Sequence, residues 1–204
     1  MTRAAAGLVL AAGEGSRYGG PKALIELSGE LLVDRAARIA RDSGCEPVVV
    51  VLGASADEVV RAAALEHAVV VVNDGWREGI GSSLRCGLAA LGDQHASAAV
   101  VLLVDQPGVG PETVRRLVGA WQDGAVAVAA SYGGDARNPV LLDASIWAGV
   151  CATAHGDVGA RAWLREHATE VVRVACDDLG SDADIDTVGD LQRLTEQMHL
   201  EDDT

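Results

Sequence analysis

The chain has 204 residues, 49% of them hydrophobic, and a formal net charge of −14. This length and apolar content allow one domain with a substantial core, so we expect a single domain over residues 1–200 and a short acidic tail over residues 201–204. The acidic balance argues against binding to nucleic acid, which requires a broad basic surface. It remains compatible with a small anion that is bound through a metal ion.

The cysteines and apolar runs indicate neither secretion nor a membrane span. Four widely spaced cysteines without a C-x-x-C pair are typical of reduced thiols rather than of a disulfide framework or a zinc site. No apolar run approaches the roughly 20 residues that cross a bilayer. The short apolar run after Arg3 leads into a glycine-rich loop, so we interpret it as a strand and not as a signal peptide. We therefore expect a cytoplasmic protein that binds no membrane.

Short apolar runs alternate with amphipathic stretches along most of the chain. Buried strands are predicted over residues 8–11, 48–52, 68–72, 99–104 and 125–130. Helical spacing is found over residues 31–43, 55–66, 82–91 and 111–122. The continuous apolarity of the strands indicates that both faces of their sheet are covered.

Residues with positional preferences mark the ends of these helices. Ser55, Ser82 and Pro111 stand where helices begin, whereas Gly44 and Gly92 stand where they stop. The alternation of strand and helix predicts an α/β fold: a doubly wound, mostly parallel sheet in a three-layer α/β/α arrangement.

Ligands of such a sheet collect beyond the carboxyl ends of its strands. Residues 12–22, residues 73–81 and Asp105 all fall at that edge. The topology alone therefore places these segments near one another.

After Ser131 the pattern is less regular. The predicted elements there are a strand or hairpin over residues 132–143, helices over residues 143–150 and 158–167, and a strand over residues 169–175. The stretch over residues 187–200 predicts a final helix with Leu191, Leu194 and Met198 on one side.

A glycine-rich loop follows the first predicted strand, within GLVLAAGEGSRYGGPKAL at residues 7–24. Its glycines allow the backbone to approach an anion closely, and Arg17 and Lys22 supply positive charge. We expect both cations in an exposed loop, where they would contact the phosphates of a nucleotide. Solvated surface cations are the alternative.

Two common phosphate motifs do not match this loop. A P-loop requires lysine directly after its last glycine, but Pro21 follows Gly20. A dinucleotide fingerprint that starts at Gly13 requires a third glycine where Tyr18 stands. The loop therefore belongs to another class of phosphate site.

Asp105 ends a strongly apolar strand and precedes Gln106 and Pro107. A carboxylate at this edge of the sheet suits Mg²⁺, which prefers one or two carboxylates together with substrate phosphates. The alternative is an aspartate that organises the turn before Pro107 or caps a helix.

A second acidic segment, residues 177–187, lies just before the final helix. Ile185 is predicted to anchor it on the core, which directs Asp184 and Asp186 to the opposite side. The alternative is a solvated loop in which Asp186 or Thr187 caps the helix.

Gly81, Ser82 and Ser83 open a predicted helix after a glycine-containing loop. Their hydroxyl and backbone N–H groups would suit a base or ribose, although capping alone explains Ser82 equally well.

The spelling LAAGEGSRYGGPKAL resembles the signature LAAGxGxRxGxxKxL of nucleotidyltransferases that build activated sugars, diphosphocytidyl alcohols and molybdopterin dinucleotides. Further segments resemble the successive blocks of the molybdenum cofactor cytidylyltransferases: GIGSSLRCGL (79–88), LLVDQP (102–107), ARNPVLLD (136–143), GDVGAR (156–161) and DIDTVGDL (184–191). The resemblance spans nearly the whole chain and implies a Rossmann-like nucleotidyltransferase fold.

The resemblance also implies a role for each block. Lys22, Arg17 and Asp105 would be catalytic, and Asp105 with Asp186 would hold the cofactor Mg²⁺. The nucleotide would contact Leu10, Ala11, Ala12, Gly13, Gly15, Ser16, Arg17, Lys22, Gly81, Ser82 and Ser83. The acceptor would contact Asn138, Pro139, Gly156, Asp157, Gly159 and Arg161.

The implied reaction moves CMP from CTP to the terminal phosphate of molybdenum-bearing molybdopterin, releasing pyrophosphate and forming a cytosine dinucleotide cofactor. Molybdenum hydroxylases or their maturation chaperones are the implied partners. Within the family, LAAG is associated with cytidine nucleotides and LAGG with guanosine, and Ala12 leaves less room for a purine.

Three alternatives remain open. One is a nucleotidyltransferase that uses another nucleoside triphosphate, or a sugar or alcohol phosphate. Another is a relative of nicotine blue oxidoreductase, although the broken dinucleotide fingerprint and the lack of an acidic residue at Leu52 or Gly53 count against NAD. The third is a non-catalytic nucleotide-binding cofactor chaperone, against which Asp105 and Asp186 count. The acceptor and the oligomeric state also stay open.

Overall fold

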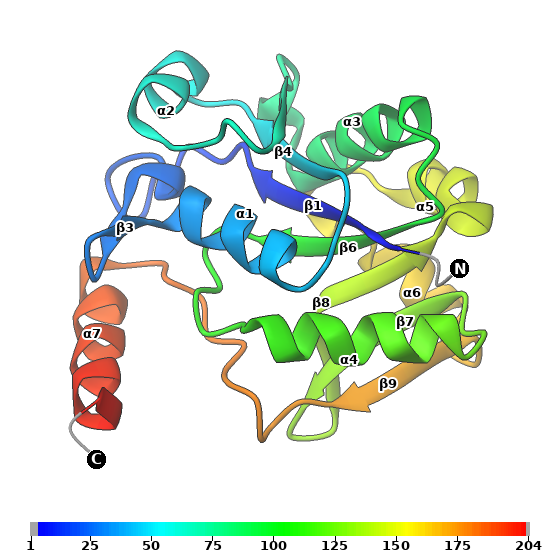
Figure 1. The fold of residues 1–204 in the computed structure, drawn as a ribbon. Coiled ribbons are helices and arrows are strands. Elements are labelled where there is room, and N and C mark those ends of the chain that lie inside the picture. Colours follow the sequence, from blue (N-terminus) through cyan, green and yellow to red (C-terminus); the bar gives the residue numbers. More distant parts are fainter. Residues whose placement is uncertain (1–3, 203–204) are drawn as a thin grey trace.

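The computed structural model describes residues 4–202, with the side chains of residues 4–196. Its centre is a seven-stranded sheet in the order β5-β4-β1-β6-β8-β7-β9 (Figure 1). Its strands are β1 (Ala6–Ala11), β4 (Val48–Leu52), β5 (Val69–Val72), β6 (Ala98–Leu103), β7 (Ala127–Tyr132), β8 (Asp135–Asp143) and β9 (Val171–Ala175). Only β8 is antiparallel to its neighbours within this sheet, so the predicted mostly parallel α/β fold is confirmed.

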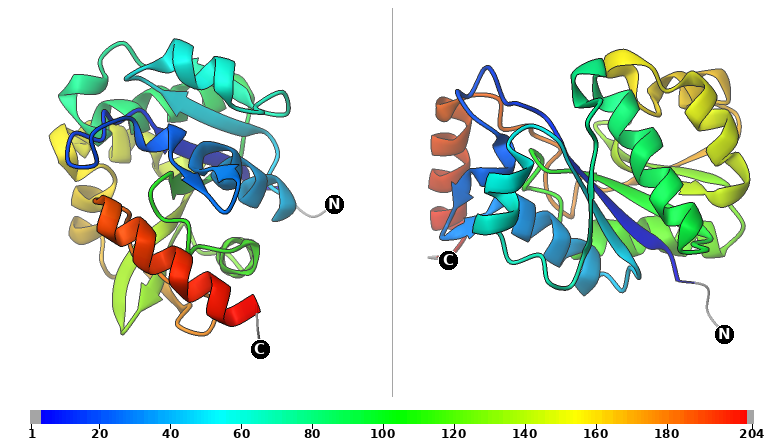
Figure 2. Two further views of the ribbon diagram at one scale, coloured as in Figure 1. Left: turned by 90° about the vertical axis from the view of Figure 1, so that its left-hand side faces the viewer. Right: turned by 90° about the horizontal axis from the view of Figure 1, so that it is seen from above.

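Helices cover both faces of the sheet, which gives the predicted three layers (Figure 2). Buried residues of α1 (Leu32–Asp42), α2 (Ala56–Ala62) and α4 (Pro111–Gln122) belong to one apolar core. Those of α3 (Ile80–Asp93), α5 (Trp147–Thr153) and α6 (Arg161–Glu166) belong to the other.

Alternation along β1 shows why its run is apolar throughout. Val9 and Ala11 belong to the core under α1 and α4, whereas Leu8 and Leu10 belong to the core under α3 and α5. Successive side chains of a strand point to opposite faces, and here both faces are covered.

Two of the predicted helix boundaries are confirmed. Pro111 is the first residue of α4, and Gly44 has a φ of 84° just after the end of α1. The glycine conformation stops the helix because residues with a Cβ rarely adopt it.

A third boundary is also confirmed, because Ser55 is the N-cap residue of α2, although its φ is 54° and it makes no side-chain capping bond. The helix ends earlier than expected, at Ala62. The remaining two boundary signals are wrong. Ser82 lies in the first turn of α3, which begins after Gly79. Gly92 lies inside α3, because helical hydrogen bonding continues to Asp93.

The less regular second half also differs in detail. Of the strand or hairpin predicted over residues 132–143, the strand is found as β8, which pairs with β7. The strand predicted over residues 125–130 is β7, which starts two residues later than expected. Short 3-10 turns, η3 (Ala144–Ile146) and η4 (Gly156–Val158), precede α5 and α6. The sequence prediction missed the small hairpin of β2 (Glu26–Leu27) and β3 (Glu30–Leu31), because strands of two residues show no periodicity.

The final helix α7 (Val188–Asp202) lies beside β3 at one end of the molecule (Figures 1 and 2). Leu191 and Leu194 pack against the core under α1, as predicted, while Met198 lies outside the described side chains. Within residues 4–202, no helix is both long and apolar enough to cross a bilayer.

Two helical glycines give a matched test of the packing between α3 and β1. A Cβ at Gly87 would lie 2.3 Å from Leu8 Cδ1 and 2.9 Å from Val51 Cγ2, whereas a Cβ at Gly119 in α4 would meet nothing within 4 Å. We expect Gly87→Ala to lower the free energy of unfolding by about 1–3 kcal/mol through overpacking. Gly119→Ala should raise it by about 0.5–1 kcal/mol through helix propensity. Urea denaturation measures both, and equal effects would contradict the close approach.

Candidate functional site

The glycine-rich loop, the end of β6 and the segment before α7 meet at one ammonium group. Lys22 Nζ donates hydrogen bonds to Asp105 Oδ2 at 2.7 Å and to Asp186 Oδ1 at 2.6 Å. Arg17 Nη1 donates to Asp186 Oδ2 at 3.1 Å. The structure therefore brings together the four residues that the sequence analysis assigned to catalysis or metal binding.

The end of β6 positions both carboxylates. Asp105 follows β6, and its carbonyl oxygen accepts a hydrogen bond from the N–H of Ile185 at 2.8 Å. Ile185 is 1% exposed, as predicted for the apolar residue that anchors this segment. Because Asp186 comes next in the chain, this anchor holds its carboxylate beside Lys22.

The glycine-rich loop folds back on itself around one carbonyl. Gly15 O accepts hydrogen bonds from the N–H groups of Tyr18 and Gly19, both at 2.9 Å. Gly15 has a φ of 63°, and a Cβ there would lie 2.0 Å from Gly20 O, so only glycine fits this position. Gly13, Ser16 and Arg17 remain exposed. These exposed residues of the loop are thus the ones available to an anion.

Lys22 is less exposed than the sequence suggested. It begins the 3-10 turn η1 (Lys22–Leu24), and its side chain is only 15% exposed, whereas that of Arg17 is 77% exposed. The expectation of an exposed loop thus holds for Arg17 and is wrong for Lys22. The two carboxylates from distant segments account for this, since they compensate the charge of the partly buried ammonium.

The contacts within the cluster shift the pKa values of Lys22 and Asp186 in opposite directions. Partial burial alone lowers the pKa of Lys22, but hydrogen bonds to Asp105 and Asp186 outweigh it and raise that pKa above its ordinary value. The hydrogen bond from Lys22 is the main cause that lowers the pKa of Asp186, and the charge of Arg17 lowers it further.

Asp105 and Asp186 form a donor set that fits a divalent ion. They direct carboxylate oxygens to one point, and Mg²⁺ takes one or two carboxylates and completes its shell with water and substrate phosphates. Among the residues that the structure describes, no group of three or more His, Cys, Asp or Glu side chains is placed to hold a metal by itself. A metal bound here would compete with Lys22 and would rely on the substrate for further ligands.

A cleft of about 540 Å³ lies next to this cluster, on the α3 side of the sheet. Gln106 and Asp184 line its near end, and a hydrogen bond joins their side chains. Partial burial, which removes water from the carboxylate, raises the pKa of Asp184, and the nearby negative charge of Asp105 raises it further. The cleft has an apolar floor that includes Leu10 and Leu103.

Most of the predicted acceptor residues lie at this cleft. Asn138, Asp157, Gly159 and Arg161 line it. Two predicted acceptor residues do not line the cleft. Pro139 is buried in β8. The backbone of Gly156 packs against Gly79, because a Cβ added to Gly79 would lie 2.5 Å from Gly156 O. The GDVGAR segment forms η4 and then enters α6, which lies within the helix predicted over residues 158–167.

The serine hydroxyls at the start of α3 are buried and hydrogen-bonded within the protein. Ser82 and Ser83 are 6% and 3% exposed, and both hydroxyls accept hydrogen bonds from Asn73 Nδ2, at 2.8 and 3.1 Å. The Ser82 hydroxyl also lies 2.9 Å from the carbonyl oxygens of Gly75 and Gly79. The backbone N–H of Ser82 donates a hydrogen bond to Gly79 O at 3.1 Å.

The other predicted nucleotide contacts are mostly backbone positions. Gly81 packs against Ala154, because an added Cβ would lie 2.6 Å from its carbonyl oxygen. Ala11 and Ala12 are buried, and Ala12 O accepts a hydrogen bond from Ala54 N at 3.0 Å. The Ser82 and Ser83 hydroxyls thus form hydrogen bonds within the protein. Leu10, another predicted nucleotide contact, lines the cleft.

The sequence analysis missed four side chains of the site. Gln106 is 9% exposed, donates to Asp182 O at 3.1 Å, and keeps its Oε1 without a hydrogen-bond partner among the described residues. Arg165 and Arg173 line the cleft, and Asn73 holds the start of α3. The position of Gln106 directly after Asp105 was the one usable signal.

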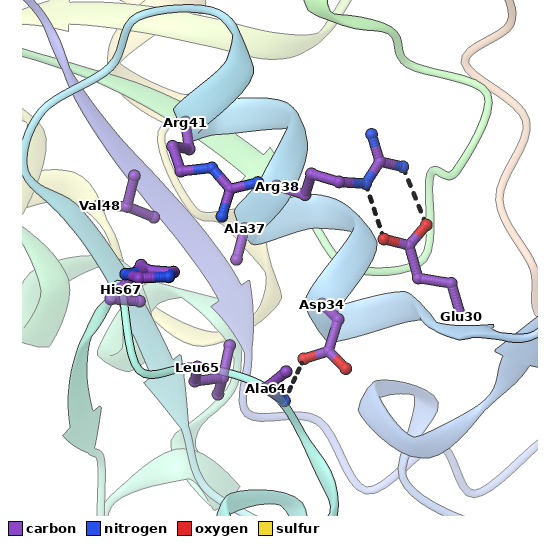
Figure 3. Close-up of a pocket in the computed structure, with 10 residues that line it drawn as sticks. Glu30, Asp34, Ala37, Arg38, Arg41, Val48, Ala64, Leu65 and His67 are labelled. Carbon is purple, nitrogen blue, oxygen red and sulfur yellow. Dashed lines mark hydrogen bonds and ion pairs between the residues drawn. The ribbon is translucent and has the colours of Figure 1, made fainter.

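A smaller cavity of about 160 Å³ lies away from the cluster, between α1 and the segment before β5 (Figure 3). Arg38 donates two hydrogen bonds to Glu30, at 2.7 and 2.9 Å, and Asp34 accepts one from Ala64 N at 2.9 Å. Because the charged groups around this cavity form hydrogen bonds with neighbouring protein groups, we interpret it as a packing feature between two elements and not as a ligand site.

Comparison with known proteins identifies the family. The model of the MobA-like NTP transferase domain matches residues 7–171, and the chain belongs to that family. The resemblance noted in the sequence is thereby confirmed at this level, while the particular substrate is not.

Two curated relatives carry different activities. Nicotine blue oxidoreductase of Paenarthrobacter nicotinovorans is 40% identical over 195 residues, which cover 92% of this chain and 95% of that protein. A probable molybdenum cofactor guanylyltransferase of Opitutus terrae is 39% identical over 106 residues, which cover 52% of this chain and 50% of that protein.

A solved structure supports the fold over the full length. Rv0371c from Mycobacterium tuberculosis H37Rv superposes with a TM-score of 0.80 at 30% identity, covering 96% of this chain and 100% of that one. A second structure of Rv0371c, in complex with manganese, superposes with a TM-score of 0.77 over 95% of this chain and 98% of that one, at 29% identity.

Replacing the ammonium group tests how it balances the two carboxylates. In Lys22→Met, Asp105 and Asp186 lose the ammonium group between them, and exposed Arg17 is the remaining counter-charge, so we expect a melting temperature about 5 °C lower in metal-free buffer. Mn²⁺ should then stabilise the variant more than the wild type, because the ion no longer competes with Nζ. Thermal denaturation with and without Mn²⁺ measures both. The control is Arg61→Met on the exposed surface of α2, and an equal response of the two variants would contradict the arrangement.

The lowered pKa of Asp186 predicts a pH dependence of stability. A carboxyl whose folded pKa lies below its ordinary 3.8 stabilises the fold above that pH and loses this contribution as the pH falls through the folded value. The difference in unfolding free energy between wild type and Asp186→Asn should therefore be largest near neutral pH and shrink toward about pH 3. Urea titrations across this range measure it, with Asp93→Asn as the control. A difference that is constant with pH would contradict the ion pair.

Proposed function

We propose that this protein transfers a nucleotidyl group from a nucleoside triphosphate to an anionic acceptor in a reaction that depends on a divalent metal. One observation carries the proposal: Lys22 Nζ lies within 2.7 Å of both Asp105 and Asp186, beside a glycine-rich loop and at the end of the cleft. Membership of the MobA-like NTP transferase domain family supports the same reaction class.

The reaction requires positioning and charge compensation more than covalent catalysis. An attacking phosphate oxygen is already ionised, so no general base is needed, and the developing charge on the phosphates must be neutralised. Lys22 would contact the oxygens of the transferred phosphate, and exposed Arg17 would hold the departing pyrophosphate. Asp105 and Asp186 would hold Mg²⁺ or Mn²⁺, which neutralises phosphate charge when bound.

The finer part of the proposal is the pair of substrates. The sequence blocks favour CTP as donor and molybdopterin as acceptor, with molybdenum hydroxylases or their maturation chaperones as partners. A relative described as a probable molybdenum cofactor guanylyltransferase supports the acceptor class over part of the chain. Ala12 is 5% exposed and close to Gly53, and we infer that it limits the room for a purine.

A second candidate function rests on the longer sequence match. The 40% identity with nicotine blue oxidoreductase covers nearly all of both chains, more than any match to a molybdenum cofactor enzyme given above. The apolar floor of the cleft, which includes Val101 and Val140, suits a planar ring system. The placement of a lysine between two carboxylates suits phosphates better than it suits hydride transfer, and it favours the first candidate.

One experiment separates the two functions. CTP, GTP, ATP and UTP are each incubated with Mg²⁺, purified molybdopterin and the protein, and the products are identified by mass spectrometry. The first candidate predicts a cytosine dinucleotide and pyrophosphate. A parallel assay follows oxidation of NADH and NADPH with a quinone-type dye. Dye reduction without any nucleotidyl product would favour the oxidoreductase.

Asp105→Asn gives the sharpest variant for the proposed transfer. The amide keeps the size of the side chain but removes a negative charge from the site of metal binding, so we expect turnover to fall by about 100-fold at limiting Mg²⁺. The exposed Asp93 at the end of α3 supplies the matched control Asp93→Asn, which should retain activity. Normal turnover of Asp105→Asn would show that this carboxylate only organises the turn after β6.

A further inference from the structure

The floor of the cleft is a row of residues that crosses the sheet. Register pairs join Val101 of β6 to Val140 of β8, Val140 to Ala129 of β7, and Ala129 to Arg173 of β9. Paired residues project from the same face, and all four line the cleft. The apolar row therefore ends in a guanidinium at the edge strand of the sheet.

Two further arginines of the cleft lining belong to α6. Arg161 follows η4, and η4 packs against α3, while Arg165 lies one helical turn farther along α6. Arg161, Arg165 and Arg173 all line the cleft, and none forms an ion pair or hydrogen bond within the described part of the chain.

Five arginines form no ion pair within the described side chains, residues 4–196, and three of the five, all exposed, line this cleft. The chain has 30 acidic and 16 basic residues, so carboxylates are abundant, and the nine other described arginines form ion pairs. Arg161 and Arg165 also repel each other at an i,i+4 spacing. Unpaired cations that gather in a cleft despite this repulsion indicate an anionic ligand.

The two ends of the cleft have opposite charge. Asp182 and Asp184 line the end beside the Lys22 cluster, and Asp182 is also paired with Arg137 at 3.2 Å. Arg173 lies three strands away from β6, which is about 14 Å at the usual strand spacing. Asp157 lies between, on η4 beside Gly79. A ligand that spans the cleft meets a metal-compatible acidic end, an apolar floor and a basic end.

We propose that Arg165 and Arg173 form a second anion subsite, which selects acceptors whose apolar body carries another anionic group remote from the reacting phosphate. The assignment of this ligand as the acceptor rests on the proposed nucleotidyl transfer. Guanidinium groups bind carboxylate and phosphate through paired hydrogen bonds, so the subsite favours these groups over neutral polar ones. Arg161 remains the partner of the reacting end, one turn closer to η4.

Two rigid probes test the subsite directly. Biphenyl-4-sulfonate and biphenyl-4-sulfonamide share an apolar body and differ only in the charge of the single end group, and isothermal titration measures their affinities. The wild-type protein should bind the sulfonate about tenfold more tightly. Arg165→Gln and Arg173→Gln should each remove most of this preference while changing the affinity for the neutral sulfonamide little. Arg61→Gln, which removes an equal charge from the surface of α2, should keep the preference.

The outcomes separate this inference from the proposed function. Equal affinity of the wild type for both probes, or an equal loss of preference in Arg61→Gln, would overturn the subsite. If nucleoside triphosphates still give nucleotidyl products in that case, the proposed function stands. A retained preference for the sulfonate without nucleotidyl product from any triphosphate would contradict the proposed function and, with it, the assignment of the ligand as an acceptor.

Discussion

The site depends on one ammonium group shared by two carboxylates that are remote in sequence. Lys22 is the only lysine of the chain, and its bonds to Asp105 and Asp186 join η1, the end of β6 and the segment before α7. Removing it would leave the two close carboxylates with only exposed Arg17 as a counter-charge, which is costlier than losing an ordinary surface ion pair. The same three groups are the ones that a triphosphate and its metal would engage. The contacts of Lys22 that join the three segments are therefore the same ones on which the proposed chemistry depends.

The sheet explains how a small domain places opposite charges at the two ends of one cleft. The carboxyl end of β6 carries Asp105, and its neighbours across the sheet, β8, β7 and β9, extend an apolar floor away from it. The edge strand then contributes Arg173, and α6 contributes Arg165. Ligands of open α/β sheets collect at the carboxyl ends of strands, but here the antiparallel β8 widens the floor beside that edge. An acceptor that lies across several strands fits this shape.

Much of this arrangement could be predicted from the sequence, because strands buried on both faces and a glycine-rich loop leave local patterns. The same holds for Asp105 at a strand end and for buried Ile185, which forecast the position of Asp186. The sequence could not reveal that the Ser82 and Ser83 hydroxyls are occupied, because their partner Asn73 belongs to another segment. Lys22 was expected to be exposed because its partners Asp105 and Asp186 also belong to distant segments of the sequence. Arg165 and Arg173 lie on a short helix and an edge strand, where an arginine is ordinary until the fold brings the two to one cleft.

The reactivity of Lys22 toward an amine acylating reagent tests the central claim most directly, because the chain has no other lysine that competes. Mass spectrometry distinguishes the peptide that is modified at Lys22 from the peptide that is modified at the α-amino group. The account predicts slow acylation of the free wild-type protein, faster acylation when Asp105 and Asp186 are both changed to asparagine, and continued protection of the wild type when Mn²⁺ and CTP are added together. Acylation at the rate of an exposed lysine in every state would contradict it.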